Sequence, residues 1–248
     1  MKNATRLSRR RLIRHHIDKI TSSEYIRILI LRTIGNFLIL ASLFMIGKTF
    51  YIPAKEEFRF ALDQFTKKKY VVSLKPIPQP TPAPQKGLLA KALNFNNTQV
   101  LTPEDPNFDI IIPKIAANSK IIPNVDAADE KNYLPALQEG VAQAAGTAYP
   151  GEGGHIFLFA HSTDYFWNVS RYNAVFFLLH QLVKGDEVDL FYKGQRYVYK
   201  VIGTQVVDPS QTQYLTRKTN REFLTLQTCW PPGTTLQRLL VFAVRVTE

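Results

Sequence analysis

Residues 224–244 read LTLQTCWPPGTTLQRLLVFAV, two apolar, strand-like runs that flank a short segment with two prolines and a glycine. The first run ends at Cys229, because the prolines that follow lack the amide donor that a central strand requires. The second run begins at Arg238. If the two runs pair as an antiparallel hairpin, the connection 230–237 brings Cys229 and Arg238 together, since cross-strand neighbours lie about 5 Å apart.

Cys229 is the single cysteine of the sequence, so it cannot form a disulfide within the chain. In an exported protein such a thiol is either an intermolecular partner or a reactive group. The alternative is an unreactive, buried cysteine that packs as a small apolar residue. Because Cys229 lies where a strand ends, at the rim of a sheet, the reactive alternative is favoured.

Arg238 is the first candidate to assist the thiol. A guanidinium beside Cys229 would favour the thiolate and could hold a developing oxyanion, because its charge is fixed and its donors are planar. The alternative for Arg238 is an ordinary surface cation on an edge strand.

His161 is the second candidate. It follows the apolar run Ile156–Ala160, and imidazole titrates in the range needed to protonate a leaving amine. The alternative is a hydrogen-bonded histidine at a strand end. His161 precedes Cys229 by 68 residues, so only the fold can bring the two together. The other histidines are weaker candidates, because His155 and His180 adjoin apolar runs and the remaining two lie in the basic N-terminal region.

The composition of the rest of residues 106–248 is typical of a β domain. Runs rich in Val, Ile, Phe and Tyr predict strands at Phe108–Ile112, Ile156–Ala160, Glu187–Tyr192, Arg196–Val207, Glu222–Thr228 and Arg238–Val246. Lys193-Gly194 predicts a hairpin turn. Helical spacing predicts one short helix at Val175, Leu178, Leu179 and Leu182. Gly185 could end this helix. Many short strands and little helix predict an all-β fold, a closed or nearly closed barrel.

Residues 33–52, TIGNFLILASLFMIGKTFYI, predict a transmembrane helix, because about 20 apolar residues are needed to cross a bilayer core. Residues 1–32 hold nine Lys or Arg against two acidic residues, which is +7 of the net charge of +11. The positive-inside rule therefore places residues 1–32 in the cytoplasm and everything after residue 52 outside the cell membrane. The alternatives are a cleaved signal peptide, whose apolar region would be shorter and followed by a small-residue cleavage site, and a buried core helix.

Residues 53–105 predict a juxtamembrane segment and a proline-rich linker. Phe58, Ala61, Leu62 and Phe65 have helical spacing, which predicts a short helix or a solvated spacer. Every second residue from Pro76 to Pro84 is proline, a pattern that favours an extended polyproline stalk.

The composition argues against several functions. The mean hydropathy of −0.13 excludes a polytopic membrane protein. Residues 33–248 show no stripe of cations interleaved with aromatics, so nucleic acid is not an expected partner. No Cys/His cluster has metal-ligand spacing, so no metal or cofactor is expected. A calcium site from the loop carboxylates Asp126, Asp129 and Glu130 is an alternative that nothing in the sequence supports.

Several motifs together resemble those of the sortases. TLQTC at 225–229 is similar to the TLxTC signature of that family, and Arg238 in RLLVFA resembles the arginine that leads its final strand. Ala160-His161-Ser162 resembles the segment with its catalytic histidine. Ala160 departs from the pattern, because many members have glycine there, which leaves the substrate subclass open. Further similarity lies at residues 112–115, 146–151 and 185–187.

The resemblance implies a cysteine transpeptidase on a closed β-barrel of about eight strands with one or two short helices. Cys229 would attack a backbone carbonyl in a C-terminal sorting signal of the LPxTG kind and form a thioacyl intermediate. His161 would protonate the departing amine and later deprotonate the incoming one. Arg238 would stabilise the oxyanion and, with Thr228, bind the substrate.

The implied partners are surface proteins that bear a sorting signal and an amine acceptor from a cell-wall peptide or a pilin lysine, with membrane lipid around the N-terminal helix. Two alternatives stay open. One is an exported L,D-transpeptidase, although its SHGC-like motif is not found at Thr228-Cys229. The other is an anchored β-barrel that displays a binding surface and has a non-catalytic site.

Overall fold

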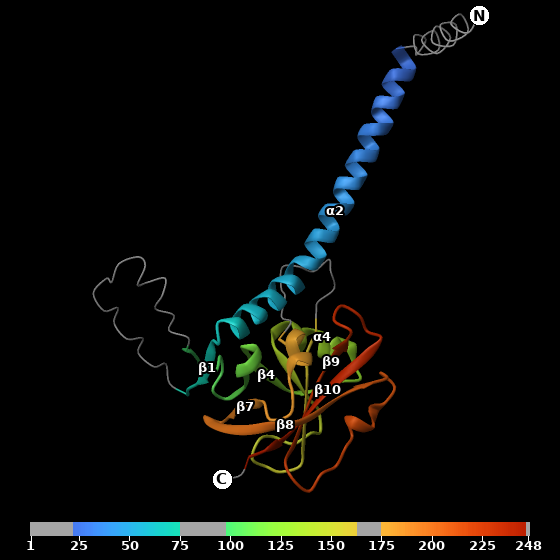
Figure 1. The fold of residues 1–248 in the computed structure, drawn as a ribbon. Coiled ribbons are helices and arrows are strands. Elements are labelled where there is room, and N and C mark those ends of the chain that lie inside the picture. Colours follow the sequence, from blue (N-terminus) through green and yellow to red (C-terminus); the bar gives the residue numbers. More distant parts are fainter. Residues whose placement is uncertain (1–21, 75–97, 163–174, 247–248) are drawn as a thin grey trace, which may run out of the picture. The chain divides into compact units, whose positions relative to one another are not determined.

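The computed structural model describes residues 22–74, 98–162 and 175–246 (Figure 1). The chain forms two compact units, residues 1–52 and 53–248. One helix, α2 (Ser22–Phe65), contributes to both, and Pro53 lies within it. The proline run from Pro76 to Pro84 lies outside the described residues.

The first unit is described from Ser22 onward and consists of the N-terminal part of α2. Among the described residues, Ser22–Lys48 is the one segment long and apolar enough to cross a membrane, a property that a signal sequence shares. It extends further toward the N-terminus than the predicted 33–52. Within this segment, the hydroxyls of Thr33 and Ser42 donate hydrogen bonds to the backbone carbonyls of Leu29 and Leu38, each at 2.8 Å.

The second unit begins with the end of α2 and a short strand pair. The predicted helical spacing at Phe58, Ala61, Leu62 and Phe65 is observed as helix, since α2 continues to Phe65. β1 (Lys69–Val72) then pairs in parallel with β2 (Thr98–Leu101). Regular structure therefore flanks the undescribed part of the expected linker on both sides.

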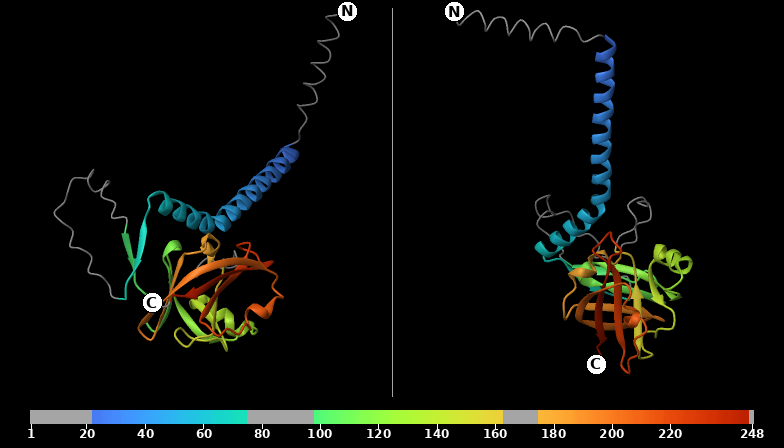
Figure 2. Two further views of the ribbon diagram at one scale, coloured as in Figure 1. Left: turned by 60° about the horizontal axis from the view of Figure 1, so that its bottom comes forward. Right: turned by 90° about the vertical axis from the view of Figure 1, so that its right-hand side faces the viewer.

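The rest of the second unit is a closed barrel of eight strands, which confirms the predicted all-β class (Figures 1 and 2). The strands are β3 (Phe108–Ile112), β4 (Ala117–Val125), β5 (Val141–Ala144), β6 (His155–Phe159), β7 (Glu187–Tyr192), β8 (Gln195–Val207), β9 (Phe223–Trp230) and β10 (Gln237–Arg245). Their order around the barrel is β10-β8-β7-β3-β4-β5-β6-β9. The pairs β4–β5 and β6–β9 are parallel, and the others are antiparallel.

The core fills the barrel, and a second apolar cluster covers part of its outside. In β6 all five residues are buried because the strand is covered on both faces. Ile156 and Leu158 belong to the interior core, whereas Phe157 and Phe159 pack with Leu137 of α4 (Glu130–Glu139). This two-sided burial explains why β6 reads as a continuous apolar run.

The local predictions were right at the six strong strands and at the turn. Lys193 and Gly194 both have positive φ, 51° and 77°, as a two-residue turn between β7 and β8 requires. The predicted helix at 175–182 is the short 3₁₀-helix η2 (Phe177–Gln181). Two further 3₁₀-helices are η1 (Pro113–Ile115) and η3 (Thr212–Tyr214). The helix α4 and the strands β1, β2, β4 and β5 were not predicted.

Candidate active site

Cys229 and Arg238 face each other across the β9–β10 ladder. The antiparallel register pairs the Cα of Arg238 with the Cα of Cys229, and the Cα of Gln237 with the Cα of Trp230. The predicted hairpin is thus present, and its strands continue one residue further toward the turn than predicted. Proline at 231 and 232 ends β9 directly after Trp230, so the thiol lies at the end of the strand.

The parallel pair β6–β9 directs the chain toward His161 and Cys229 at the same end of the barrel. Its register pairs His155 with Phe223 and continues to Phe159 with Gln227, a constant offset of 68 residues. The same offset separates His161 from Cys229. His161 lies two residues beyond the end of the ladder, half-buried, at the rim of the barrel.

Thr228 extends the contact between the two strands beyond the ladder. Its Oγ1 donates a hydrogen bond of 2.9 Å to the carbonyl of Ala160, the residue before His161. The amide of Ala160 donates at 3.1 Å to the carbonyl of Gln227. Thr228 is buried, so these bonds hold the backbone of Ala160 against β9 without competition from water.

A pocket of about 280 Å³ opens at this rim, and Thr228, Cys229 and Arg238 line it. Phe157 and Phe159 of β6 contribute apolar wall, together with Tyr133 and Leu215. Further lining residues come from the segment after β8, among them Asp208, Gln211 and Thr212. His161 is not among the lining residues, and the segment that follows it, 163–174, lies outside the described residues.

The electrostatic setting keeps the thiol protonated in the free protein. Burial raises the pKa of Cys229 above its ordinary value of 9.0, and the positive charge of Arg238 opposes that rise without cancelling it. The guanidinium of Arg238 is itself held in place, because its Nη1 donates to the carbonyls of Thr235 and Gln237, each at 3.1 Å. A cation therefore lies near a neutral thiol.

The other two described histidines have different surroundings. His155 is buried, and its Nε2 lies 2.8 Å from Oγ1 of Thr225. Burial lowers the pKa of His155 to about 4, so it is neutral at physiological pH. His180 lies 3.2 Å from a carboxylate oxygen of Glu57 and packs on Trp230. Neither lines the pocket that contains Cys229.

The loop carboxylates considered for calcium have local partners. Asp129 is the N-cap of α4 and accepts from the amide of Lys131 at 3.0 Å. Asp126 accepts from the amide of Ala128 at 2.9 Å. Among the described residues, no group of three or more His, Cys, Asp or Glu side chains could hold a metal ion.

Sequence reasoning missed the pocket residues supplied by loops and by α4. Asp208, Gln211 and Tyr133 are far from Cys229 along the chain, and no motif marks them. The prolines around this region, such as Pro209, signal a turn but not the pocket to which the turn contributes.

The sequence matches one protein family and is similar to a known member of that family. The family model of the Sortase domain matches residues 110–246. Sortase D of Bacillus subtilis (strain 168) is 31% identical over 139 residues, which are 55% of this chain and 62% of that protein. The match thus spans less than two thirds of this relative.

Two solved structures are also similar. Sortase C-1 from Actinomyces oris has 33% identity and a TM-score of 0.48, with 58% of this chain and 76% of that chain covered. Sortase C from Clostridium perfringens SM101 has 27% identity and a TM-score of 0.44, with 56% and 69% covered.

Proposed function

The chain belongs to the sortase family, and we propose that it is a cysteine transpeptidase with Cys229 as nucleophile, His161 as acid and base, and Arg238 as oxyanion ligand. One observation carries the assignment. Cys229 is the Cα partner of Arg238 across β9–β10, both residues line one pocket, and the parallel ladder β6–β9 ends two residues before His161 and two before Cys229. Family membership also removes the L,D-transpeptidase alternative.

The proposed reaction has two acyl transfers. The sulfur of Cys229 attacks the carbonyl carbon of a substrate peptide bond while its proton passes to His161. The C–N bond then breaks, the departing amine takes that proton, and a thioester remains on the sulfur. An acceptor amine attacks the thioester and gives a proton to His161. The C–S bond breaks, and the departing thiolate of Cys229 takes that proton back from the imidazolium. Two such steps replace one difficult amide exchange.

The raised pKa of Cys229 lowers the fraction of thiolate in the free protein. A thiol that stays protonated at rest does not react with small electrophiles at full rate, so the free enzyme is protected. The thiolate must be generated in the complex, by proton transfer to the imidazole. Arg238 supports this step because its charge stabilises both the thiolate and the later oxyanion.

Arg238 has donors to spare for a substrate. Both bonds to backbone carbonyls use Nη1. A guanidinium has five N–H donors, so Nη2 and Nε can turn toward the pocket that Arg238 lines. Thr228 is proposed to bind substrate through its pocket-facing surface, while its hydroxyl stays on Ala160.

Membership of the family and the apolar part of α2 support a proposal for the substrate and the location. We propose that the substrate is the C-terminal sorting signal of a surface protein, LPxTG-like, and that the acceptor is a cell-wall or pilin amine. Ser22–Lys48 would anchor the chain in the cell membrane, with the basic N-terminus in the cytoplasm and the barrel outside.

The test is to trap the acyl-enzyme. Full-length protein in detergent is mixed with an LPxTG-containing peptide and no amine, and intact-mass spectrometry should show an adduct on Cys229 that an added amine removes. Cys229→Ala and His161→Ala should lose transfer while remaining folded. A Cys229→Ala protein that still transfers the peptide would refute the proposal. Thiol modification at a rate that the peptide does not change, together with no acyl adduct, would favour a display module.

A further inference from the structure

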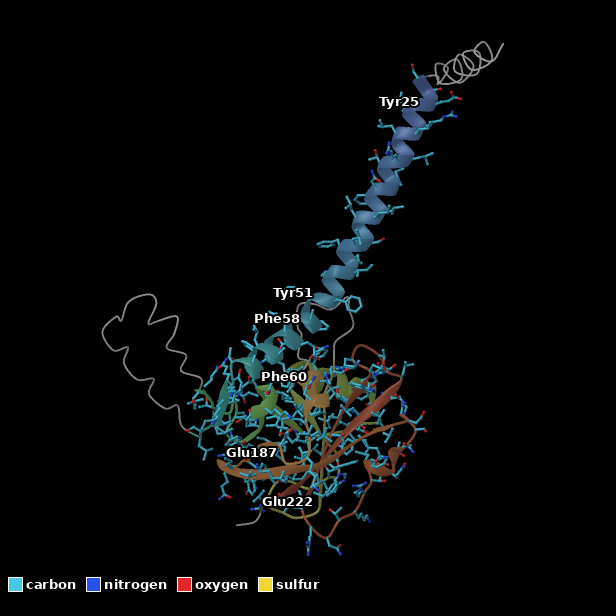
Figure 3. The ribbon with its side chains drawn as sticks, in the orientation of Figure 1. Tyr25, Tyr51, Phe58, Phe60, Glu187 and Glu222 are labelled. Carbon is cyan, nitrogen blue, oxygen red and sulfur yellow. The ribbon has the colours of Figure 1, made fainter. Side chains whose placement is uncertain are left out.

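The C-terminal part of α2, residues 53–65, is amphipathic, and its apolar side is exposed. Phe58, Leu62 and Phe65 follow one another at helical spacing and form an exposed stripe, with 66%, 45% and 87% of their surfaces accessible. Ala61 lies on the same side and is also exposed. Figure 3 shows Phe58 on the side of α2 away from the barrel and Phe60 on the side toward it.

The polar side of the same helix contacts η1 of the barrel and the strand β1. Arg59 pairs with Glu56 at 2.7 Å and donates at 3.2 Å to the carbonyl of Ile115 in η1. Asp63 accepts from the hydroxyl of Tyr70 at 2.7 Å. Phe60 alone among the phenylalanines of this segment packs against the barrel core. A surface helix of a water-soluble domain has the reverse arrangement, with apolar residues inward and charges outward.

An apolar stripe of this kind is costly in water, so it needs a partner. The stripe begins ten residues after Lys48, the end of the candidate membrane span. Ten helical residues rise about 15 Å, and even a fully extended chain of that length reaches only about 35 Å. The stripe is therefore tied close to any bilayer that the span crosses.

Exposed lysines lie at both ends of the stripe. Lys55 precedes Phe58, while Lys67 and Lys69 follow Phe65, and all three are exposed. A lysine near an anionic bilayer surface contributes about 1 kcal/mol to binding. An apolar face flanked by cations is the composition of a helix that lies in the plane of the membrane interface.

We propose that Phe58, Leu62 and Phe65 insert into the headgroup region of the membrane and hold residues 53–65 parallel to its surface. This inference rests on the proposed membrane anchor. It makes the helix a second contact with lipid, which fixes the orientation of the barrel rather than only its tether. A flexible tether alone would let the barrel rotate freely.

The orientation matters for the candidate active site. Glu57, on the same part of α2, lies 3.2 Å from Nε2 of His180, and the ring of His180 packs on Trp230 at 5.4 Å between centroids. Trp230 follows Cys229 in β9. The end of the barrel that holds the nucleophile is thus the end next to the interfacial helix, so reacting groups presented at the membrane would be within reach.

The test uses depth-dependent quenching on the full chain. In a Cys229→Ser background, single cysteines Phe58→Cys, Phe65→Cys and Gln64→Cys are labelled with NBD, and the protein is reconstituted into phosphatidylcholine–phosphatidylglycerol vesicles. Gln64 is the matched control, because it is exposed on the same helix but off the stripe. Leu38→Cys, within the candidate span, reports on the anchor independently.

We expect nitroxide at a shallow lipid position to quench the labels at 58 and 65 about threefold more than the label at 64, and aqueous iodide to show the opposite order. Deep nitroxide should quench the label at 38. If 38 is quenched by deep nitroxide but 58 and 65 respond to iodide as 64 does, the anchor stands and this inference fails. If iodide reaches 38, both fail. Shielding of 58 and 65 that grows with protein-to-lipid ratio, without nitroxide quenching, would assign the stripe to a second copy and overturn the inference.

Discussion

Oγ1 of Thr228 donates a 2.9 Å hydrogen bond to the carbonyl of Ala160, so the residue before the thiol is bonded to the residue before the imidazole. The bond is buried and crosses between β9 and the end of β6 beyond the last paired residues of the ladder. It connects the two strand ends from which the proposed catalytic groups extend.

Thr228→Val should therefore impair transfer. Valine keeps the shape of threonine but leaves the Ala160 carbonyl without its donor, at a cost of about 1–3 kcal/mol in unfolding free energy. We expect the transfer rate of a labelled peptide to fall more than tenfold with little change in KM. Thr228→Ser, which keeps the hydroxyl, is the control and should recover most of the rate. Equal activity of the valine and serine variants would show that the bond does not position His161.

Arg238→Ala should shift the titration of the thiol upward. The positive charge of Arg238 opposes the rise that burial imposes on the pKa of Cys229, so its removal lets that pKa rise further. The thiolate fraction at neutral pH falls tenfold for about each unit of pKa. The rate of iodoacetamide modification, measured against pH, should show a higher midpoint. Arg238→Lys keeps the charge and should keep the midpoint close to that of the native protein, while transfer falls because the planar fork is lost. An unchanged midpoint in Arg238→Ala would contradict the electrostatic role.

Asp109 should make the barrel less stable as the pH rises. It is fully buried in β3, and burial raises its pKa from 3.8 to about 8. The folded state therefore binds a proton that the unfolded state has released, so unfolding free energy falls between pH 4 and pH 8. Asp109→Asn keeps an acceptor for the amides of Glu104 and Asp105, which Oδ2 of Asp109 now serves.

We expect Asp109→Asn to be the more stable protein at pH 8 and to have a flatter pH dependence. Urea unfolding of the full chain in detergent at pH 5 and pH 8 measures both. If the unfolding free energies of the native protein and of Asp109→Asn change by the same amount between pH 5 and pH 8, Asp109 is not the source of the pH dependence.

Phe60 and Phe58 should differ in their effect on the attachment of α2 to the barrel. Phe60 packs against the barrel core, whereas Phe58 is exposed. Phe60→Ala should weaken that packing by about 1–3 kcal/mol, less than a fully buried phenylalanine would, and speed hydrogen exchange in residues 53–65. Phe58→Ala should leave exchange in detergent unchanged. Equal exchange rates in the two variants would mean that Phe60 does not hold the helix.

Local sequence patterns predict much of this fold. The β9–β10 hairpin needs only two apolar runs and a short connection, so the approach of Arg238 to Cys229 could be predicted from residues nine positions apart. The turn at Lys193-Gly194 is local for the same reason. Short-range geometry constrains such pairs because few chain conformations connect neighbouring strands.

The elements that were missed have weak or contradictory local signals. α4 contains Pro135, and β4 contains Pro123, each a residue that argues against the element in which it lies. β5 is only Val141–Ala144, with two alanines and a glutamine. Their positions depend on burial against Phe157 and Phe159, which no window of a few residues contains.

What the sequence determined by itself was the set of strong strands, the reactive candidates Cys229, His161 and Arg238, and the family. The tertiary structure alone decided that β6 and β9 lie parallel and side by side with an offset of 68 residues, because parallel partners are joined by long connections whose path no local pattern specifies. It also decided which face of residues 53–65 is turned outward. Helical spacing marks an apolar side, but only packing against the barrel determines that the charged side is the one held.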